Sequence, residues 1–477
     1  GRKASGLKPF QGKPNQLWHS RSPSRQPSKF SKSQSFPEIS VQVEIMPIAM
    51  TMNINGSLAW PDHVPKSMAD HIHDEVRDTV ANSRLVRKSD GIALVSQNEL
   101  QIGPILGQGA FSEVHEVRVL NEQGDAHTYA MKHLKFKLMS QPDNFRLAAA
   151  ELAIEAHMLA SFDHPNIMRI RGWAANGVAS FTFGKHDSFF LLLDKLDETL
   201  DQRINTWEKQ QVMMKSQQIQ SINPVIDLWR RFSNQNPHEA AALDGEIRLY
   251  QDQLYLEKLG ICAEIASALA YLHNQGVIFR DLKPNNIGFL NGRVQLFDFG
   301  LSREIPSCDF SQAFEMSGKV GTLRYMAVEV ACHQRYNVSA DVYSWAMVCY
   351  EVLTHQKPFA DWTRDMHQHL VCGRGMRPET DRLPRNIGAL LQASWSQRAH
   401  ERPHMLAAMH KTRMLEEQHL FSCSSLHQPT PLHENVDVAV ELPHNFSLIR
   451  KCPDRTFSND TQNTGTTMSM SGLRDYV

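Results

Sequence analysis

Three chemically useful side chains lie close together in the segment at residues 277–286. Asp281 offers a carboxylate, Lys283 an ammonium group and Asn286 a carboxamide, and a pair of apolar residues precedes them. The proline at position 284 fixes its own φ and disfavours helix at the residue before it. The sequence therefore predicts that these groups lie on a loop and not on a helical face.

A second carboxylate follows a short predicted strand at residues 294–297. Asp298 stands at the end of this strand, and Gly300 two residues later allows backbone conformations that other residues rarely adopt. Carboxylate oxygens are preferred ligands of hard divalent cations. This position is therefore a candidate for holding such a cation.

Together, the two segments resemble the catalytic loop and the D-F-G metal loop of eukaryotic protein kinases. The kinase pattern H-R-D-L is Phe279-Arg280-Asp281-Leu282 here, and Asn286 stands at the expected distance. Either motif alone is weak evidence, but both in this order and at this spacing are strong. The resemblance is to the serine/threonine type and, within it, to the tyrosine-kinase-like group.

The resemblance implies an α+β, bilobal protein kinase fold with flexible tails. Its N-lobe is small and β-rich with one key helix, and its C-lobe is larger and mainly helical. We expect order to begin near residue 100, although a helix is possible at residues 68–86. The expected parts are a largely disordered region 1–98, a catalytic domain 99–415 (N-lobe 99–196, C-lobe 197–415, insertion at about 205–250) and a disordered tail 416–477.

A glycine-rich turn between two predicted strands resembles the hairpin that covers the nucleotide in kinases. Glycines let the backbone approach phosphates closely, and Phe111 can fold over them. The third glycine of the kinase pattern is Ser112 here, and an ordinary hairpin turn is the alternative interpretation. The nucleotide-binding residues that the resemblance implies in this hairpin are Leu106, Gly107, Gln108, Gly109, Ala110, Phe111, Ser112 and Val114.

The next predicted strand, at residues 128–132, resembles the kinase V-A-I-K strand and ends at Lys132. The resemblance implies that Lys132 binds the α- and β-phosphates of ATP. A helix is predicted at residues 146–162, with Glu151 and Glu155 on one side, and either periodic position suits a partner for Lys132. The H-P-N-I turn that follows resembles that of kinases, and counting back from it favours Glu155.

An apolar strand at residues 189–193 is expected to lead into the hinge between the lobes. By resemblance, the hinge backbone pairs with adenine and Leu193 flanks the adenine pocket. A plain core strand is the alternative, and both interpretations can hold together. The adenine-side residues implied are Ala130, Leu193, Asp194 and Leu196.

The stretch from Asp298 to Glu329 resembles the kinase activation segment, with Val328 in place of the proline of A-P-E. By resemblance, Glu329 forms a buried ion pair with Arg402, and Arg280 can bind a phosphate in the activation segment. An upstream kinase or autophosphorylation would supply that phosphate. The candidate acceptors are Ser307, Ser311 and Ser317.

The resemblance assigns a role in phosphoryl transfer to each polar group, with ATP and Mg²⁺ as cofactors. Asp281 would accept or orient the proton of the substrate hydroxyl, and Lys283 would neutralise the moving phosphoryl group. Asn286 and Asp298 would bind Mg²⁺. Lys132, held by Glu155, would fix the phosphates. The implied substrates are serine and threonine hydroxyls of proteins in intracellular signalling.

Four departures from the kinase pattern bear on activity. They are Phe279 for histidine, Ser112 for glycine, Gly288 for an apolar residue beneath adenine, and Val328 for proline. None removes a proton-transfer or metal-binding group, which favours an active enzyme. A weak or inactive pseudokinase scaffold and a small-molecule kinase remain alternatives.

Composition narrows the possible partners. The net charge is −1, so no strong field attracts nucleic acid, and no apolar run is long enough to span a membrane. The seven cysteines contain no C-x-x-C pair, which is typical of reduced thiols and favours a cytoplasmic protein. His71, His73 and Asp74 could bind a metal, but a solvated helix face explains them more simply.

Overall fold

The structure is a computed structural model, and it describes seven stretches of the chain. They are residues 64–85, 92–120, 126–182, 185–222, 237–306, 312–316 and 321–426. Most of both predicted tails therefore lies outside the described residues.

The N-lobe is built on a six-stranded sheet in the order β1-β5-β6-β4-β3-β2. All neighbouring strands are antiparallel except β1 and β5, which are parallel. The hairpin of β2 and β3 carries the glycine-rich turn, and the three-residue strand β1 closes the other edge. The strands are β1 (Ala93–Val95), β2 (Leu100–Gln108), β3 (Ser112–Leu120), β4 (Ala126–Leu134), β5 (Ile170–Ala174) and β6 (Phe190–Asp194).

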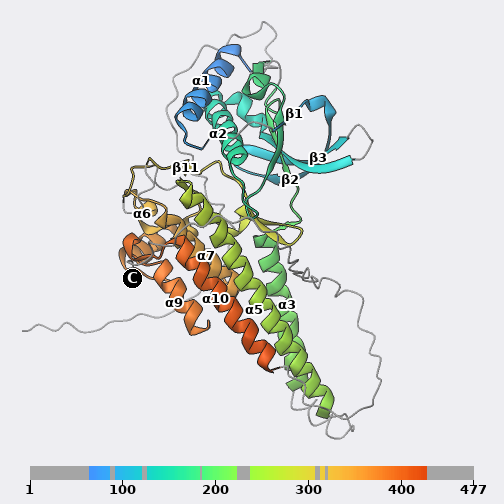
Figure 1. Cartoon of the computed structure of the whole chain (residues 1–477), viewed down its shortest axis with the longest axis vertical. Helices are drawn as coiled ribbons and strands as arrows, with labels where there is room; N and C mark the ends of the chain where they lie inside the picture. Colours follow the sequence, from blue (N-terminus) through green and yellow to red (C-terminus); the bar gives the residue numbers. More distant parts are fainter. Residues whose placement is uncertain are drawn as a thin grey trace, which may run out of the picture. The chain divides into compact units, whose positions relative to one another are not determined.

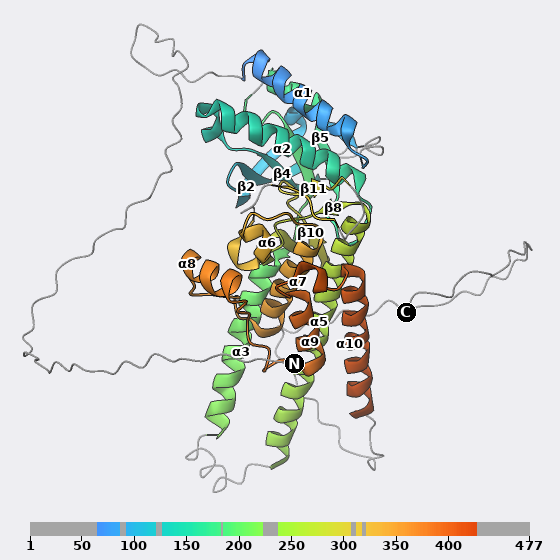
Figure 2. The ribbon, with the colours of Figure 1, turned by 90° about the vertical axis from the view of Figure 1, so that its left-hand side faces the viewer.

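Two helices pack together on this lobe, and one of them precedes the expected domain. Helix α2 (Pro142–Ser161) begins with proline, which suits the first helical turn, and its alanine-rich face is buried. Helix α1 (Lys66–Asn82) buries Ala69, Ile72 and Val76, spaced by three and four residues, and runs along α2 (Figures 1 and 2). The prediction that order begins near residue 100 was therefore wrong, because this apolar stripe is covered by packing.

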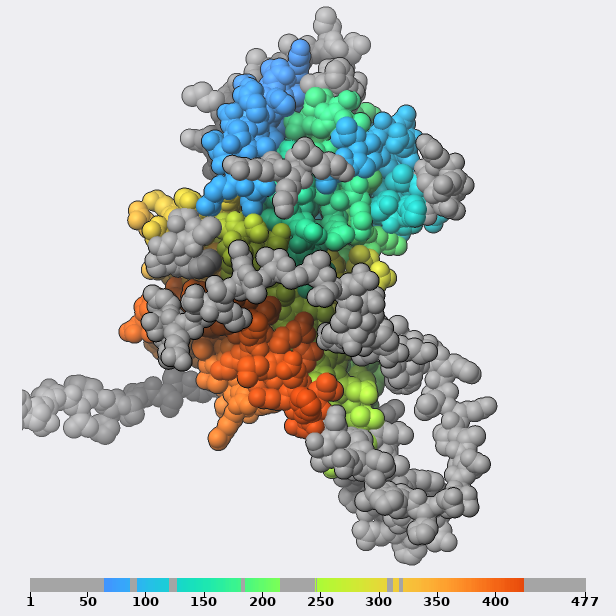
Figure 3. Space-filling model, in the orientation of Figure 1, coloured from blue at the N-terminus to red at the C-terminus, as the bar shows by residue number. Residues whose placement is uncertain are grey.

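In the space-filling view, α1 (blue) forms part of the outer surface of the N-lobe (Figure 3). His71, His73 and Asp74 are exposed there, as expected for a solvated helix face.

The C-lobe is a group of helices around α7, whose side chains are almost all buried. Trp345 of α7 donates its indole N–H to the Cys262 carbonyl of α5 at 2.9 Å, and α10 packs along α5 (Figure 1). The larger helices are α3 (Leu200–Ile222), α5 (Pro237–Asn274), α7 (Ser339–Thr354), α9 (Arg385–Ser394) and α10 (Met405–Leu426), and α6 (Val328–Ala331) is a single short turn. The short helix α8 (Arg364–Met366) precedes a π-helical turn at His367–Gly373.

Two of these helices differ in length from the prediction. Helix α5 begins at Pro237, so part of the insertion predicted at about 205–250 is a continuation of this helix. Tyr250, in the N-terminal part of α5, donates a hydrogen bond to Gln210 of α3 at 2.9 Å, and this bond joins the two helices. Helix α10 continues beyond residue 415, where we expected the domain to end.

Short strands hold the polar loops between the helices. They are β7 (Glu198–Thr199), β8 (Val277–Ile278), β9 (Ile287–Leu290), β10 (Arg293–Leu296) and β11 (Arg303–Glu304). Strand β9 pairs with both β10 and β7, and β11 pairs with β8. In the part of the chain that the structure describes, no helix has both the length and the apolarity of a transmembrane span.

Candidate active site

One buried carboxylate of α7 holds the loop after β8 in place. Asp341 accepts hydrogen bonds from the backbone N–H groups of Phe279 at 2.8 Å and Arg280 at 2.9 Å. Arg280 has a φ of 75°, a conformation that costs free energy for a residue with a side chain. The Asp341 hydrogen bonds compensate this strain in the backbone that leads to Asp281.

Asp281 is buried and surrounded by donors. Lys283 Nζ lies 2.6 Å from Asp281 Oδ2, Asn286 Nδ2 lies 3.0 Å from the same oxygen, and the Thr322 N–H donates to Oδ1 at 3.1 Å. Burial raises the pKa of Asp281, and the hydrogen bond from Lys283 opposes that shift. The three side chains predicted to share a loop therefore meet at one carboxylate.

Close approach of the activation segment to this carboxylate requires glycine at position 321. Gly321 has a φ of +101°, and a Cβ there would lie 2.8 Å from the Arg280 carbonyl oxygen and 3.0 Å from Asp281 Oδ1. Any side chain would push the segment away from the loop and break the Thr322 hydrogen bond. The steric role of Gly321 is evident only from the structure.

Lys132 lies between two carboxylates. Its Nζ is 2.7 Å from Glu155 Oε2 and 2.8 Å from Asp298 Oδ1. Burial alone would lower the pKa of Lys132, but the two carboxylates together raise it. Lys132 in turn lowers the pKa of Asp298. Glu151, the alternative partner, instead lies 3.6 Å from Arg303.

The residues expected to bind a cation have oxygens available for it. The amide nitrogen of Asn286 donates to the backbone oxygen and to the carboxylate of Asp281, so its amide oxygen is the atom that remains. The backbone of Asp298 has a φ of 65°, and its side chain is 46 % exposed. These two oxygen donors fit the preference of Mg²⁺ for a few protein oxygens completed by phosphate and water.

Phe279, which replaces the usual histidine, packs against the aromatic ring of the D-F-G loop. The Phe279 and Phe299 rings lie 5.1 Å apart edge to face, and Phe162 lies 5.4 Å from Phe299. The Phe299 N–H also donates to Glu155 at 3.2 Å. The contacts of Phe299 with Phe162 and Glu155 place the D-F-G loop against α2.

The glycine-rich hairpin closes with one short hydrogen bond. The Gly109 N–H donates to the Ser112 carbonyl at 2.8 Å, and the phenyl ring of Phe111 is exposed. A Cβ at Gly109 would lie 3.0 Å from Ser112 Oγ, so the serine crowds the turn where the kinase pattern has glycine. Val114 lies directly across from Lys132 in the β3–β4 ladder.

On the adenine side, a hinge residue fills the space above Gly288. A Cβ on Gly288 would lie only 2.4 Å from Leu196 Cδ1, so the Leu196 side chain occupies the place that an apolar residue at 288 would take. Leu193 pairs with Ala130 in the sheet, as expected for neighbouring pocket residues. The Asp194 carboxylate binds Arg171 at 2.8 Å, which leaves only its backbone for a ligand. The sequence marked Gly288 as a departure from the kinase pattern, but it gave no sign that Leu196 takes the vacant place.

The end of the activation segment is anchored as expected. Glu329 and Arg402 form a bidentate ion pair with distances of 2.6 and 2.8 Å, and both are buried. Arg280, the expected phosphate sensor, lies over the ring of Tyr336 at 5.8 Å. Ser307, Ser311 and Ser317 lie outside the described residues.

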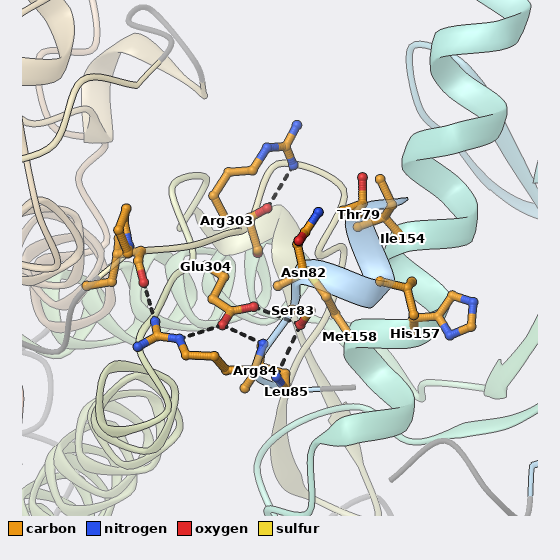
Figure 4. Close-up of a pocket in the computed structure, with 14 residues that line it drawn as sticks. Thr79, Asn82, Ser83, Arg84, Leu85, Ile154, His157, Met158, Arg303 and Glu304 are labelled. Atoms are coloured by element: carbon orange, nitrogen blue, oxygen red, sulfur yellow. Dashed lines mark hydrogen bonds and ion pairs between the residues drawn. The ribbon is translucent and has the colours of Figure 1, made fainter. Parts of the chain in front are cut away.

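The end of α1 contacts the activation segment just after the D-F-G loop. Glu304 of β11 accepts hydrogen bonds from the Ser83 hydroxyl at 2.7 Å and from the Arg84 N–H and Nε at 2.9 Å each. The same region borders a pocket of about 450 Å³ formed by α1, α2 and β11 (Figure 4). Sequence reasoning missed this contact because a serine and an arginine after a helix carry no specific signal.

A two-lobed fold in which Lys132 binds Glu155 and Asp298, and Lys283 binds Asp281, is the arrangement of the protein kinase class. Residues 100–412 match the family described as protein tyrosine and serine/threonine kinase. The chain therefore belongs to that family.

Curated relatives match parts of the chain. The chain is 28 % identical over 271 residues to ribosomal protein S6 kinase 2 alpha of Gallus gallus, covering 57 % of this chain and 28 % of the relative. It is 29 % identical over 256 residues to ribosomal protein S6 kinase alpha-1 of Homo sapiens, covering 54 % and 27 %. It is 32 % identical over 167 residues to serine/threonine-protein kinase VIK of Arabidopsis thaliana, covering 32 % and 36 %. The match thus spans about a third or less of these relatives' own length.

Proposed function

We propose that the protein is an active serine/threonine protein kinase that transfers the γ-phosphoryl group of Mg-ATP to protein hydroxyls. The observation that carries the proposal is the joint presence of two polar clusters. Asp281 is bound by Lys283 and Asn286, and Lys132 is bound by Glu155 and Asp298. A pseudokinase need not keep both, so their retention favours catalysis.

Each group has a defined task in this proposal. Bound Mg-ATP supplies the phosphoryl group and the cation charge that offsets its negative oxygens. Asp281 accepts the hydrogen bond of the acceptor hydroxyl and orients its oxygen, while Lys283 stabilises negative charge on the transferred group. Lys132 fixes the α- and β-phosphates, and Asp298 and Asn286 hold Mg²⁺. The hairpin at Gly107–Ser112 excludes water.

The preference for serine and threonine rests on two supports. Lys283 follows Asp281 by two residues, which is typical of serine/threonine kinases. Relatives such as the VIK protein are also named serine/threonine kinases. We further propose that an upstream kinase or autophosphorylation acts on the activation segment and that the protein works in signalling in the cytoplasm.

Transfer of labelled γ-phosphate to a serine- and threonine-rich protein tests the proposal. The wild type should transfer label in the presence of Mg²⁺, and Asp281→Asn should lose about 1,000-fold or more of kcat while still binding ATP. Asp298→Asn should lose activity together with Mg²⁺-dependent nucleotide binding. Acid hydrolysis should recover label on phosphoserine or phosphothreonine.

ATP binding without any transfer by folded, phosphorylated wild type would refute the proposal and favour a scaffold. Ser112, Gly288 and Val328 would then be the residues to revert first.

A further inference from the structure

A cluster of metal-binding side chains lies on the face of β3 and β4 opposite the nucleotide side. Glu113 lies directly across from His133 in the ladder, and His115 is two residues farther along β3. Because alternate residues of a strand point to opposite faces, these three share one face, and Val114 and Lys132 share the other.

The two histidines are oriented by backbone carbonyl groups. His133 Nδ1 lies 2.8 Å from the Leu134 oxygen, and His115 Nδ1 lies 3.3 Å from the Gly103 oxygen. A carbonyl oxygen can only accept, so each Nδ1 carries the hydrogen and each Nε2 keeps a lone pair. Metal-binding histidines in proteins are commonly oriented by such a hydrogen bond from the other ring nitrogen.

The donor atoms are close enough for one ion. Glu113, His115 and His133 each offer one ligand atom within 4.8 Å of the other two, and His115 Nε2 is 4.0 Å from Glu113 Oε2. Metal–ligand bonds of about 2.0–2.2 Å require only small side-chain rotations from these separations. The His115 and His133 rings already stack with centroids 5.1 Å apart.

A fourth donor lies beside the cluster. The His186 ring is 5.8 Å from the His133 ring, and its buried Nδ1 has no hydrogen-bond partner among the described residues. Burial lowers the pKa of both His133 and His186.

We propose that Glu113, His115 and His133 bind a divalent transition-metal ion of the Zn²⁺ class, with His186 able to complete the coordination. Imidazole nitrogen with one carboxylate suits Zn²⁺ and not Mg²⁺, which prefers oxygen ligands alone. The bound ion would join β3 to β4 one residue away from Val114 and Lys132. This site is separate from the Mg²⁺ site proposed at Asn286 and Asp298.

A second group of possible ligands lies between α5 and α10. Asp252 of α5 faces His419 and Cys423 of α10. The Asp252 carboxylate lies 3.2 Å from His419 Nε2. This group serves as an internal comparison in the experiment.

The experiment titrates the full chain with Zn²⁺ by calorimetry and with Co²⁺ by visible absorption, in the absence of nucleotide and Mg²⁺. The wild type should bind one ion tightly, and Co²⁺ should give the strong absorption bands of low-coordinate nitrogen and oxygen ligation. Glu113→Gln and His115→Ala should each weaken binding about 10-fold or more, by analogy with losses of 10–100-fold for outer-shell partners alone. Both residues are partly exposed, so these variants should keep the wild-type melting temperature without metal.

Two variants serve as controls. His127→Ala removes an exposed histidine of the same strand β4, and Cys423→Ser removes a ligand of the second group; both should bind as the wild type does. Unchanged binding in Glu113→Gln and His115→Ala would overturn the proposal, as would loss of the ion only in Cys423→Ser. Because no nucleotide is present, failure here leaves the proposed kinase activity untouched.

Discussion

Helix α2 is held on its two sides by interactions of different kinds. On the inner side, the Glu155 side chain is only 3 % exposed, and it binds Lys132 and the Phe299 N–H. On the outer side, α1 covers α2 with an apolar stripe that includes Ile72, and a partly exposed ion pair joins Arg146 to Glu75. The inner contact is charged and specific, whereas the outer contact is mainly buried apolar area.

This difference predicts how each side responds to mutation. A buried charge that loses its partner costs free energy, so a single substitution at the inner contact should sharply lower the catalytic rate. Apolar burial contributes in proportion to area, so the outer contact should weaken gradually and affect stability first. Both sides also reach the activation segment, the inner through Phe299 and the outer through Glu304. The position of α2 is therefore linked to the position of the activation segment.

Breaking the inner contact should have the largest effect. Glu155→Gln removes one of the two carboxylates that hold Lys132, so Lys132 should shift toward Asp298 and misplace the phosphates. Because small misplacements of reacting groups can cost about 100-fold, we expect a loss of that order in kcat/KM. Steady-state kinetics at varied ATP would measure it.

Glu151→Gln is the matched control, one helical turn earlier on α2. Its partner is Arg303 at 3.6 Å and not Lys132, so its kcat/KM should stay within a few-fold of the wild type. Equal losses in the two variants would contradict the assignment of Glu155 as the partner of Lys132.

Weakening the apolar side should mainly lower stability. Ile72 of α1 is completely buried. Ile72→Ala should lower the free energy that holds α1 on the N-lobe by about 2–4 kcal/mol. Thermal unfolding would show a lower melting temperature or a separate early transition of α1. His73→Ala, at an exposed neighbouring position, should melt like the wild type, and an equal melt for Ile72→Ala would show that α1 is not docked.

The inner side of α2 was predictable from the sequence, but the outer side was not. Lys132 and Glu155 stand in short motifs whose spacing is set by one strand and one helix, so local pattern is sufficient. The Arg84–Glu304 contact joins residues 220 positions apart, and no short motif encodes it. The helical period at residues 68–86 indicated α1 itself, but not the surface that it covers.

A similar limit applies to the adenine side. The kinase pattern identified Gly288 as a missing apolar side chain and thus as a departure that bears on activity. Only the three-dimensional arrangement places Leu196 in that space, because hinge and β9 meet through tertiary packing. A departure from a motif therefore identifies where to look, and packing decides what the departure means.

A smaller loss is expected from the polar contact between α1 and β11. Glu304→Gln weakens the bonds from Ser83 and Arg84, and Arg84 is 48 % exposed, so solvent screens part of the interaction. We expect a decrease of about 3- to 10-fold in kcat/KM, since charge-assisted hydrogen bonds contribute about 1.5–3 kcal/mol before that screening. Hydrogen exchange should also become faster at residues 303–306.

Glu315→Gln is the comparison for this effect. Glu315 lies in the same segment and is 86 % exposed, with Arg335 at 3.7 Å. If it lowers activity as much as Glu304→Gln does, the loss comes from charge in the segment in general and not from the contact with α1.

The smallest effect should come from the ion pair at the rim of the outer side. Arg146 and Glu75 are 43 % and 37 % exposed, and pairs of this kind contribute about 0.2–1 kcal/mol. A double-mutant cycle with Arg146→Ala and Glu75→Gln should therefore give a coupling free energy in that range, decreasing as salt is added. A coupling as large as the effect of Ile72→Ala would mean that charge, and not apolar area, holds α1 on α2.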